Sequence, residues 1–458
     1  MKITLAFPAR RKDLADHSNS LLPLGFLSMA WLLMKRGHDV KLVHLARFRR
    51  KDAIAVIAAD SPDVVGLSCF TFQRHETLEI AAEVRAALPK TFVVLGGPHA
   101  GPLAHEYLRR APYIDAVATG EAERTIVDLV ETLAAKGDLS NVAGLAIRAS
   151  LGRPAVWIDD LDELALPATI PFPIVGVSIP YQTRHLMASR GCGARCTFCH
   201  APVAWGRKVR RRSVSSLIRE LEALRDETGL AFVSFRDDTF TSDRPWVHEV
   251  CRAMIDGRLD LQWDCQTRAT ALDGETLDAM RRAGCVQVQI GLETASDRLL
   301  RILRKPLTVA LAQQAVDACR AAGMSTSLYL MYGIPEETGD DIAATERFVR
   351  ACRPNSVSLA RLSHFPGTAI SASVPNDLWF SSPDDHLYAT DEKWVERHAD
   401  RYRALENEIA RSSPYTLLEL RQVAERLKAP SPWLALASLL EEHGKLHDAE
   451  QCYRDVLA

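Results

Sequence analysis

Over the first 150 residues, apolar runs of strand length alternate with amphipathic stretches of helical periodicity. The strand candidates begin at Ile3, Asp39, Val64, Phe92 and Ala116. The clearest helical patterns run from Phe26 to Arg36 and from His75 to Leu88. This alternation predicts a doubly wound, Rossmann-like parallel sheet with right-handed crossovers. Since such sheets bind ligands at the carboxyl ends of their strands, we expect a ligand site in the loops that follow them.

The loops after these strands contain small and polar residues suited to holding a ligand. The candidates are Ser68, Thr71, Gly96, Gly97, Pro98, His99, Gly120 and Glu121. Gly96 and Gly97 follow a β-branched run directly, and without β-carbons they allow the backbone to approach a large ligand. An ordinary tight turn is the alternative interpretation of this glycine pair.

A second pattern of repeating strands and helices extends over residues 181–375, after a proline-dotted linker predicted for residues 151–180. About six strand–helix units predict an open, partial (β/α)6 barrel, whose functional residues belong at the carboxyl ends of its strands. The polar residues at these ends are Asp237, Asp238, Arg268, Glu293, Glu336 and Thr338. Each alone is more often a helix cap or a surface group, but together they predict a polar ligand site.

Cys192, Cys196 and Cys199 lie within eight residues after the first predicted barrel strand. Thiolates are soft ligands for zinc, copper(I) or iron–sulfur clusters, and Gly191 helps a short loop to wrap around such a centre. Three local ligands leave one position of a tetrahedral metal or a cubane cluster open for another ligand. Structural zinc would need a fourth ligand, and His200 is cramped beside Cys199.

The composition is that of an ordinary globular protein, because 47% of the 458 residues are apolar, 25% are charged and the net charge is −2. The other seven cysteines are scattered singly, which predicts reduced thiols in a cytoplasmic protein. The amino terminus lacks the pattern of a signal peptide, and the longest apolar run, residues 21–34, is too short to span a membrane. The basic run from Arg207 to Arg212 precedes a helix and predicts a solvated or interdomain face, so we expect no nucleic-acid partner.

The last region, residues 376–458, predicts a small helical extension. Its final segment matches one tetratricopeptide-like unit at Trp433, Leu436, Ala437, Leu440, Gly444, Ala449 and Tyr453. A single unit makes no array. We therefore expect a helical pair that docks on the barrel and closes over substrate, with docking of another protein as the weaker alternative.

Two sets of motifs resemble one enzyme family. The C-x3-C-x2-C loop, with Phe198 before its last cysteine, resembles the radical SAM superfamily signature. The phrases PLGFLSMAWLLMKRGHDV, PDVVGLS, LGGPHAG and DAVATGEAERT resemble the cobalamin-binding domain found ahead of many radical SAM enzymes. Residues 1–368 as a whole are thus similar to the cobalamin-dependent radical SAM enzymes.

The resemblance implies three cofactors and their ligands. Cys192, Cys196 and Cys199 would hold a 4Fe-4S cluster, whose fourth iron binds S-adenosylmethionine (SAM). Contacts to SAM would come from Phe198, Asp237, Arg268 and Glu293, and contacts to cobalamin from the eight candidates in the loops of the first domain. Many cobalamin domains carry a D-x-H-x-x-G motif that is missing here, since Asp16 and His17 are adjacent. Cobalamin's own base would then be displaced without a histidine replacing it, or its lower face would be open or water-bound, or the domain would be empty.

The implied function is methyl transfer to an unactivated carbon through a 5′-deoxyadenosyl radical, with cobalamin delivering the methyl group. We expect a small-molecule or peptide substrate and an electron donor such as flavodoxin or ferredoxin. One alternative is a non-methylating radical rearrangement, cyclisation or C–S bond formation. An alternative of another class is a corrinoid-binding sensor whose cluster is structural. No catalytic side chain is identified from the sequence.

Overall fold

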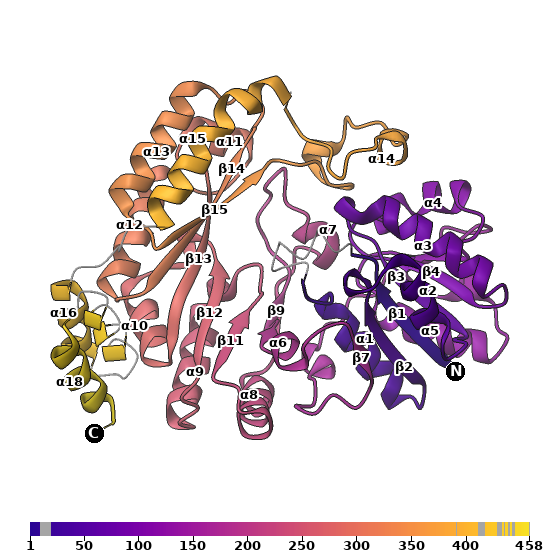
Figure 1. Ribbon diagram of the computed structural model, residues 1–458, viewed down its shortest axis with the longest axis horizontal. Helices are drawn as coiled ribbons and strands as arrows, with labels where there is room; N and C mark the ends of the chain where they lie inside the picture. The colour runs from indigo at the N-terminus through magenta and orange to yellow at the C-terminus, as the bar shows by residue number, and fades with distance from the viewer. Residues whose placement is uncertain are drawn as a thin grey trace.

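The structure is a computed structural model, and it describes residues 1–9, 20–390, 392–410, 417–427, 433–434, 436–437, 440–441 and 445–457. Two sheets dominate it, one of seven strands and one of six (Figure 1). The first sheet belongs to the amino-terminal domain and the second to a partial barrel, so the predicted fold class is confirmed.

The seven-stranded sheet has the order β6-β5-β4-β3-β1-β2-β7. Its five predicted strands are parallel and are β1 (Lys2–Phe7), β2 (Asp39–His44), β3 (Val64–Ser68), β4 (Phe92–Gly96) and β5 (Ala116–Ala118). An edge strand absent from the prediction, β6 (Leu145–Ile147), runs antiparallel to β5. Strand β3 is buried along its whole length, as expected for a sheet covered on both faces.

Helices cover both faces of this sheet. One face is covered by α1 (Leu24–Lys35) and α5 (Glu123–Ala134), which bury residues such as Leu27 and Leu129 in one apolar cluster. The other face is covered by α2 (Arg50–Ala58), α3 (Arg74–Ala87) and α4 (Ala104–Arg110), which pack in a second cluster. The arrangement is doubly wound, as the alternating pattern predicts.

Residues 151–180, predicted as a linker, contribute to the first domain. Strand β7 (Ile174–Val175) extends its sheet by pairing in parallel with β2. Phe172 joins the apolar cluster under α1, and Ile158 and Leu161 are buried near Leu32. The prolines keep the segment extended, while the apolar residues between them supply burial that the prediction overlooked.

The six-stranded sheet is parallel, and its strands follow one another in sequence order. They are β8 (His185–Leu186), β11 (Phe232–Phe235), β12 (Gln262–Thr267), β13 (Cys285–Glu293), β14 (Ser325–Tyr332) and β15 (Ser356–Arg361). The connecting helices are α8 (Val214–Thr228), α9 (Arg244–Asp256), α10 (Gly274–Arg282), α11 (Asp297–Ile302), α12 (Val309–Ala321) and α13 (Gly339–Cys352). Capping side chains lie at the starts of these helices, as Ser213 does for α8. The order of the parallel strands, with helices between them, fits the predicted open barrel.

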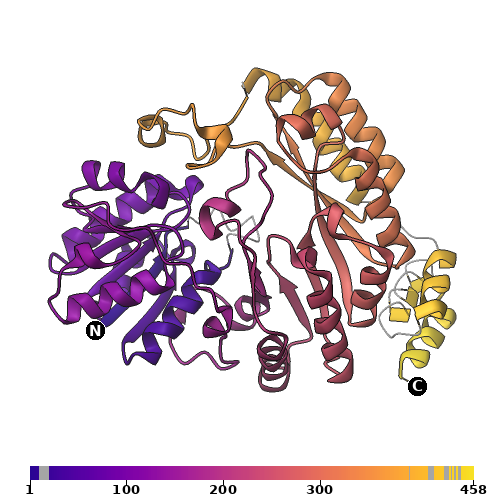
Figure 2. The ribbon, with the colours of Figure 1, turned by 180° about the vertical axis from the view of Figure 1, so that it is seen from behind.

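After β15 the chain leaves the barrel and crosses to the first domain. Residues 369–390, here called the strap, contain the short helix α14 (Leu378–Ser381) and lie over the region of α3 and α4 (Figures 1 and 2). Trp379 is buried in the apolar cluster of the first domain. Arg74 fixes the strap, because its guanidinium donates to the carbonyl oxygens of Trp379 (2.7 Å), Ser382 (3.1 Å) and Asp385 (2.7 Å).

Replacement of Arg74 by alanine is expected to release the strap, because several of its carbonyl groups lose their donors at once. Each such charge-assisted hydrogen bond contributes roughly 1.5–3 kcal/mol. Limited proteolysis should cut the variant within residues 369–390 much faster than the unchanged protein. Arg110→Ala is the control, since its partner Asp377 is 80% exposed at the side chain. Equal cleavage rates in Arg74→Ala and Arg110→Ala would contradict this account of the strap.

The strap returns to the barrel, and the chain continues as α15 (Glu392–Ala410), which packs Leu405 and Ile409 into the barrel core. The helices α16 (Leu417–Leu427) and α18 (Leu446–Leu457) follow, and the described residues between 433 and 441 are helical as well. Leu436, Ala437, Leu440, Ala449 and Cys452 form a cluster with Trp433 and Tyr453, as expected for a packed helical pair. Gly444 of the predicted unit lies outside the described residues.

Helix α16, which precedes the predicted unit, docks on the barrel, whereas the docking of the unit itself and its closure over substrate stay predictions. Arg426 of α16 pairs with Asp278 and donates to the carbonyl of Ala321 (2.9 Å). Val423 packs against Gly323, which precedes β14 and thus lies at the amino-terminal edge of the sheet. The cysteine loop follows strands at the opposite, carboxyl edge, so the strap rather than α16 lies near it.

Candidate functional site

The cysteine loop lies between two short strands that pair antiparallel, β9 (Ser189–Arg190) and β10 (Arg210–Arg211), and is followed by α7 (Ala201–Trp205). Gly191 has a φ of +99°, and a β-carbon there would stand 2.3 Å from the carbonyl oxygen of Lys208. Only glycine therefore fits where the chain turns from β9 into the loop. Cys192 is buried, whereas Cys196 and Cys199 are half-buried, and none of the three forms a disulfide.

The three thiols lie close enough to influence one another. Burial raises the pKa of Cys199 to about 12, and Asp238, Cys196 and Cys192 add to the rise. Burial also raises the pKa of Cys196, while Lys305 and Arg268 lower it. The thiols of Cys196 and Cys199 are thus protonated without a metal, and a bound metal centre would have to displace their protons.

The donor set fits an iron–sulfur cluster. Three unpaired thiols on one glycine-containing loop supply three soft ligands. Among the described residues, no three side chains of His, Cys, Asp or Glu converge as ligands of a single ion would. Cysteines of a cubane cluster bind different iron atoms and stand farther apart than ligands of one ion, so this spacing is compatible with a cluster.

Arg268 and Glu293 lie near the cysteine loop, at the carboxyl ends of their strands. Arg268 follows β12, lowers the pKa of Cys196, and has a buried Nε atom without a partner in the described part of the chain. It also lines an open cavity of about 450 Å³ together with Thr241 and Thr270. Glu293 pairs with Lys305 at 2.7 Å, and Gly291 makes room for the pair, because a β-carbon there would stand 2.8 Å from a Glu293 oxygen.

Asp237 and Asp238 differ in their surroundings. Asp237 is fully buried and accepts hydrogen bonds from the Ala188 N–H (2.8 Å) and the Ser189 hydroxyl, so its carboxylate supports β9. Burial raises its pKa to about 7, against the effect of these hydrogen bonds. Burial raises the pKa of Asp238 to about 6, and its Oδ2 is buried without a partner in the described residues. Asp238, rather than Asp237, therefore has an oxygen free beside the cysteines.

The remaining predicted mouth residues have separate places. Phe198 packs against an apolar cluster that includes Leu299 and Met331, beside the cysteine loop. Thr338 caps α13 in a reciprocal pair with Asp341. The side chain of Glu336 is 72% exposed and lies 3.7 Å from Arg298. Thr338 and Glu336 are thus a cap and a surface group, which corrects their prediction as part of the ligand site.

Lys305 was missed by sequence reasoning, although it lies in the phrase LRKPLT after the helix that follows Glu293. The sequence does not single this lysine out, because it is one of several basic residues in that segment. Only the fold shows that it reaches Glu293 and influences Cys196.

The loops of the first domain meet the cysteine loop. His200, next to Cys199, contacts the backbone of Pro98 in the first domain and of Pro366 before the strap. Burial lowers the pKa of His200 to about 4, so this imidazole is neutral. The Ile370 N–H of the strap donates to the Thr197 carbonyl within the cysteine loop (3.0 Å). Three parts of the chain therefore converge beside Cys199.

Several predicted cobalamin contacts support one another within the first domain. Gly97 has a φ of +97°, and a β-carbon there would stand 2.8 Å from the Cys69 carbonyl oxygen, so it allows close packing of its own backbone. His99 is buried, shares a hydrogen bond with Thr71 (3.1 Å), and has an Nε2 without a partner in the part that the structure describes. Ser68 ends β3, Gly96 ends β4, and Gly120 follows β5 with a φ of +63°. Their roles toward cobalamin stay predictions.

Glu121 has a different role from the predicted one. Its side chain is fully buried, and its two oxygens accept from Arg190, from Arg210 (2.7 Å) and from the Ile158 N–H (2.8 Å). Glu123 adds a second carboxylate to Arg190 at 2.7 Å. Both oxygens of Glu121 are thus occupied by ion pairs and a hydrogen bond, which corrects the prediction that this side chain contacts cobalamin.

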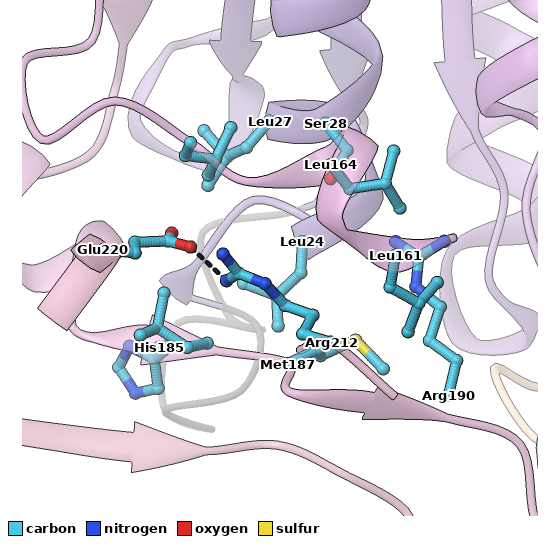
Figure 3. A pocket seen from close by; sticks show the side chains of 12 residues that line it. Leu24, Leu27, Ser28, Leu161, Leu164, His185, Met187, Arg190, Arg212 and Glu220 are labelled. Atoms are coloured by element: carbon cyan, nitrogen blue, oxygen red, sulfur yellow. Dashed lines mark hydrogen bonds and ion pairs between the residues drawn. The ribbon is translucent and has the colours of Figure 1, made fainter. Parts of the chain in front are cut away.

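A small cavity lies beside Arg190 of this network, between α1 and β8 (Figure 3). Leu24, Leu27 and Leu161 line it, together with the buried pair of Arg212 and Glu220. Its volume of about 40 Å³ has room for a few water molecules, which excludes it as a cofactor site. No helix in the described ranges is both long enough and apolar enough to cross a bilayer.

Comparison with known proteins identifies both halves of the site. Residues 12–130 match the B12 binding domain, and residues 186–349 match the Radical SAM superfamily. The chain is 29% identical over 395 residues to an uncharacterised methyltransferase of Pyrococcus horikoshii, covering 82% of this chain and 84% of that protein. It is 27% identical to cytidylyl-2-hydroxyethylphosphonate methyltransferase of Streptomyces wedmorensis, covering 84% of each.

Solved structures share the fold. The radical SAM methyltransferase TsrM from Kitasatospora setae, solved with tryptophan substrate and a SAM analogue, matches with a TM-score of 0.73 at 19% identity, covering 88% of each chain. The cobalamin-dependent enzyme OxsB, solved with aqua-cobalamin and SAM, matches with a TM-score of 0.65 at 18% identity, covering 82% of this chain and 54% of that one. The chain thus combines a B12-binding domain with a radical SAM domain, which is the domain pair of the cobalamin-dependent radical SAM enzymes.

Proposed function

We propose that this protein is a cobalamin-dependent radical SAM methyltransferase that methylates an unactivated carbon of a small molecule. The observation that carries the proposal is the contact of the cysteine loop's flanking strands with the first domain, where Arg190 of β9 and Arg210 of β10 pair with Glu121. This contact brings the predicted cluster ligands beside the predicted cobalamin loop. Relatives named as methyltransferases match more than four fifths of the chain, which favours methyl transfer over the other radical reactions.

The chain's own residues would bind and orient the cofactors. Cys192, Cys196 and Cys199 would hold a 4Fe-4S cluster, and Arg268, Lys305 and Glu293 would orient the charged end of SAM beside it. When bound, the cluster and SAM supply a carbon-centred radical that abstracts hydrogen, and cobalamin supplies the methyl group. The strap would exclude water from the space between the two domains, because it touches the cysteine loop and is anchored on the first domain.

Product analysis tests this proposal. Reconstituted protein loaded with cobalamin and given a reductant and SAM should release both 5′-deoxyadenosine, from radical formation, and S-adenosylhomocysteine, from removal of the methyl group. With SAM deuterated in its methyl group and a small-molecule extract as substrate source, a deuterated methyl product should appear. Deoxyadenosine without S-adenosylhomocysteine, in protein that contains cobalamin, would refute methyl transfer while leaving radical chemistry intact.

A further inference from the structure

The two faces of the barrel sheet differ sharply in polarity. Residues on the face toward the helices are apolar and belong to the main barrel core, as Phe235, Trp263, Val288 and Leu328 do. Because side chains alternate along a strand, their neighbours face the barrel interior. These interior residues are mostly polar and include Ser234, Arg236, Asp264, Gln266, Gln289, Ser327 and Tyr329. Closed barrels of this type fill their interior with branched apolar side chains, so this interior is built for a polar ligand.

The polar interior residues are joined across three strands. Gln266 stands opposite Gln289 in the register of β12 and β13. The Tyr329 hydroxyl of β14 accepts a hydrogen bond from Gln266 (3.2 Å) and donates one to Gln289. Two residues before Gln266 on β12, Asp264 accepts a hydrogen bond from the Ser234 hydroxyl of the neighbouring strand β11. These bonds hold the side chains in fixed orientations, which a specific binding surface requires.

Arg236 stands on the same face, two residues after Ser234 at the end of β11. It is half-buried, and its guanidinium forms no ion pair and no hydrogen bond within the part of the chain that the structure describes. Four groups face it. The charge of Arg236 affects the pKa values of Asp264, Tyr329 and His185. Arg184 is the fourth group, and its charge also affects the pKa of His185. Glu293 also acts on Tyr329, but it is paired with Lys305, so Asp264 is the one carboxylate left to balance the two guanidinium groups.

The single carboxylate does not neutralise this region. Asp264 already accepts from Ser234, and burial raises its pKa while Arg236 and Arg184 lower it. Burial, together with the positive charges of Arg236 and Arg184, lowers the pKa of His185 to about 4, so this imidazole adds no charge. Arg184 is held by stacking on the Tyr181 ring at 4.1 Å, which leaves Arg236 as the cation turned to the interior.

We propose that Arg236 binds an anionic oxygen group of the substrate, either a carboxylate or a phosphate-type group, and that Gln266, Gln289 and Tyr329 bind the adjacent polar part. The planar guanidinium matches such groups with two parallel hydrogen bonds. Arg268 and Glu293 lie farther along their strands, at the carboxyl edge of the sheet. A substrate anchored at Arg236 therefore extends toward the predicted SAM site. The inference rests on the proposed function and specifies its substrate as an anionic polar small molecule.

Binding of simple oxyanions tests this inference without the true substrate. Malonate, inorganic phosphate and methylphosphonate are titrated against the reconstituted holoenzyme, with neutral malonamide as the uncharged probe and thermal unfolding or calorimetry as readout. At least one oxyanion should bind the unchanged protein, and malonamide should not. Which of them binds best distinguishes a carboxylate from a phosphate-type ligand. Arg236→Gln should weaken this binding about tenfold or more, and Arg236→Lys should restore part of it.

Arg252→Gln is the matched control, since Arg252 is exposed on α9 of the same strand–helix unit and should leave oxyanion binding unchanged. The inference is overturned if no oxyanion binds, if Arg236→Gln binds as the unchanged protein does, or if the affinity for SAM falls by the same factor, which would assign Arg236 to SAM. Failure of the proposed function is a separate result, because it is seen in the unchanged protein as an absence of deoxyadenosine.

Discussion

Cys199→Ala is expected to lose its cluster and, with it, all cleavage of SAM. Three thiols on one loop are the predicted protein ligands, and removal of one leaves two irons of a cubane without protein support. Loss of a residue that only hydrogen-bonds a metal ligand already lowers metal affinity by about 10–100-fold. Loss of a direct ligand should therefore lower deoxyadenosine formation by more than about 100-fold. Iron content and deoxyadenosine yield after anaerobic reconstitution are the measurements.

Cys452→Ala is the control for this substitution, because Cys452 lies in the terminal helical cluster at the far edge of the barrel. It should keep its iron and its activity. If Cys199→Ala retains both, the cysteine loop is not the cluster site.

Glu121→Ala is expected to destabilise the protein by roughly 3–5 kcal/mol, because it leaves buried arginines without their counter-charge. The side chains of Glu121, Arg190 and Arg210 are 0%, 4% and 2% exposed, so water cannot replace the lost partner. Glu123 remains beside Arg190, but Arg210 loses the one carboxylate with which it pairs among the described residues. The free energy of unfolding, from the urea dependence of circular dichroism, is the measurement.

Glu163→Ala provides the matched control, since Glu163 is 48% exposed and its pair with Arg124 spans 3.4 Å. Exposed pairs of this kind contribute at most about 1 kcal/mol. Glu121→Gln keeps the shape of the side chain and removes only its charge, so it remains informative if Glu121→Ala fails to fold. A loss no larger than that of Glu163→Ala would mean that the network does not join the two domains.

The elements that local patterns define could be predicted from the sequence. Buried parallel strands such as β3 read as continuous apolar runs, and helix caps such as Ser213 and Asp273 are of the residue types that mark helix starts in a sequence. The cysteine loop was recognisable because its ligands lie within eight residues of one another. In each case the information is contained in a short segment.

Features that depend on distant contacts were not predictable in the same way. Arg74 binds carbonyl groups about 300 residues away, and backbone carbonyls leave no mark in the sequence. Glu121 follows a strand end in the phrase TGEAE, where a ligand contact was expected, and only the docking of β9 and β10 shows that arginines occupy it. The amphipathic pattern of α16 predicts a buried face but does not specify which edge of the barrel covers it.

Metal and cofactor analysis of the anaerobically purified and reconstituted full chain tests the central claim most directly. Iron and cobalt are counted by plasma mass spectrometry, and the optical spectrum is recorded before and after reduction. We predict about four irons and one cobalamin per chain, with cluster absorption that bleaches on reduction. One zinc per chain, with neither iron nor cobalamin after reconstitution, would contradict the assignment of both cofactor sites.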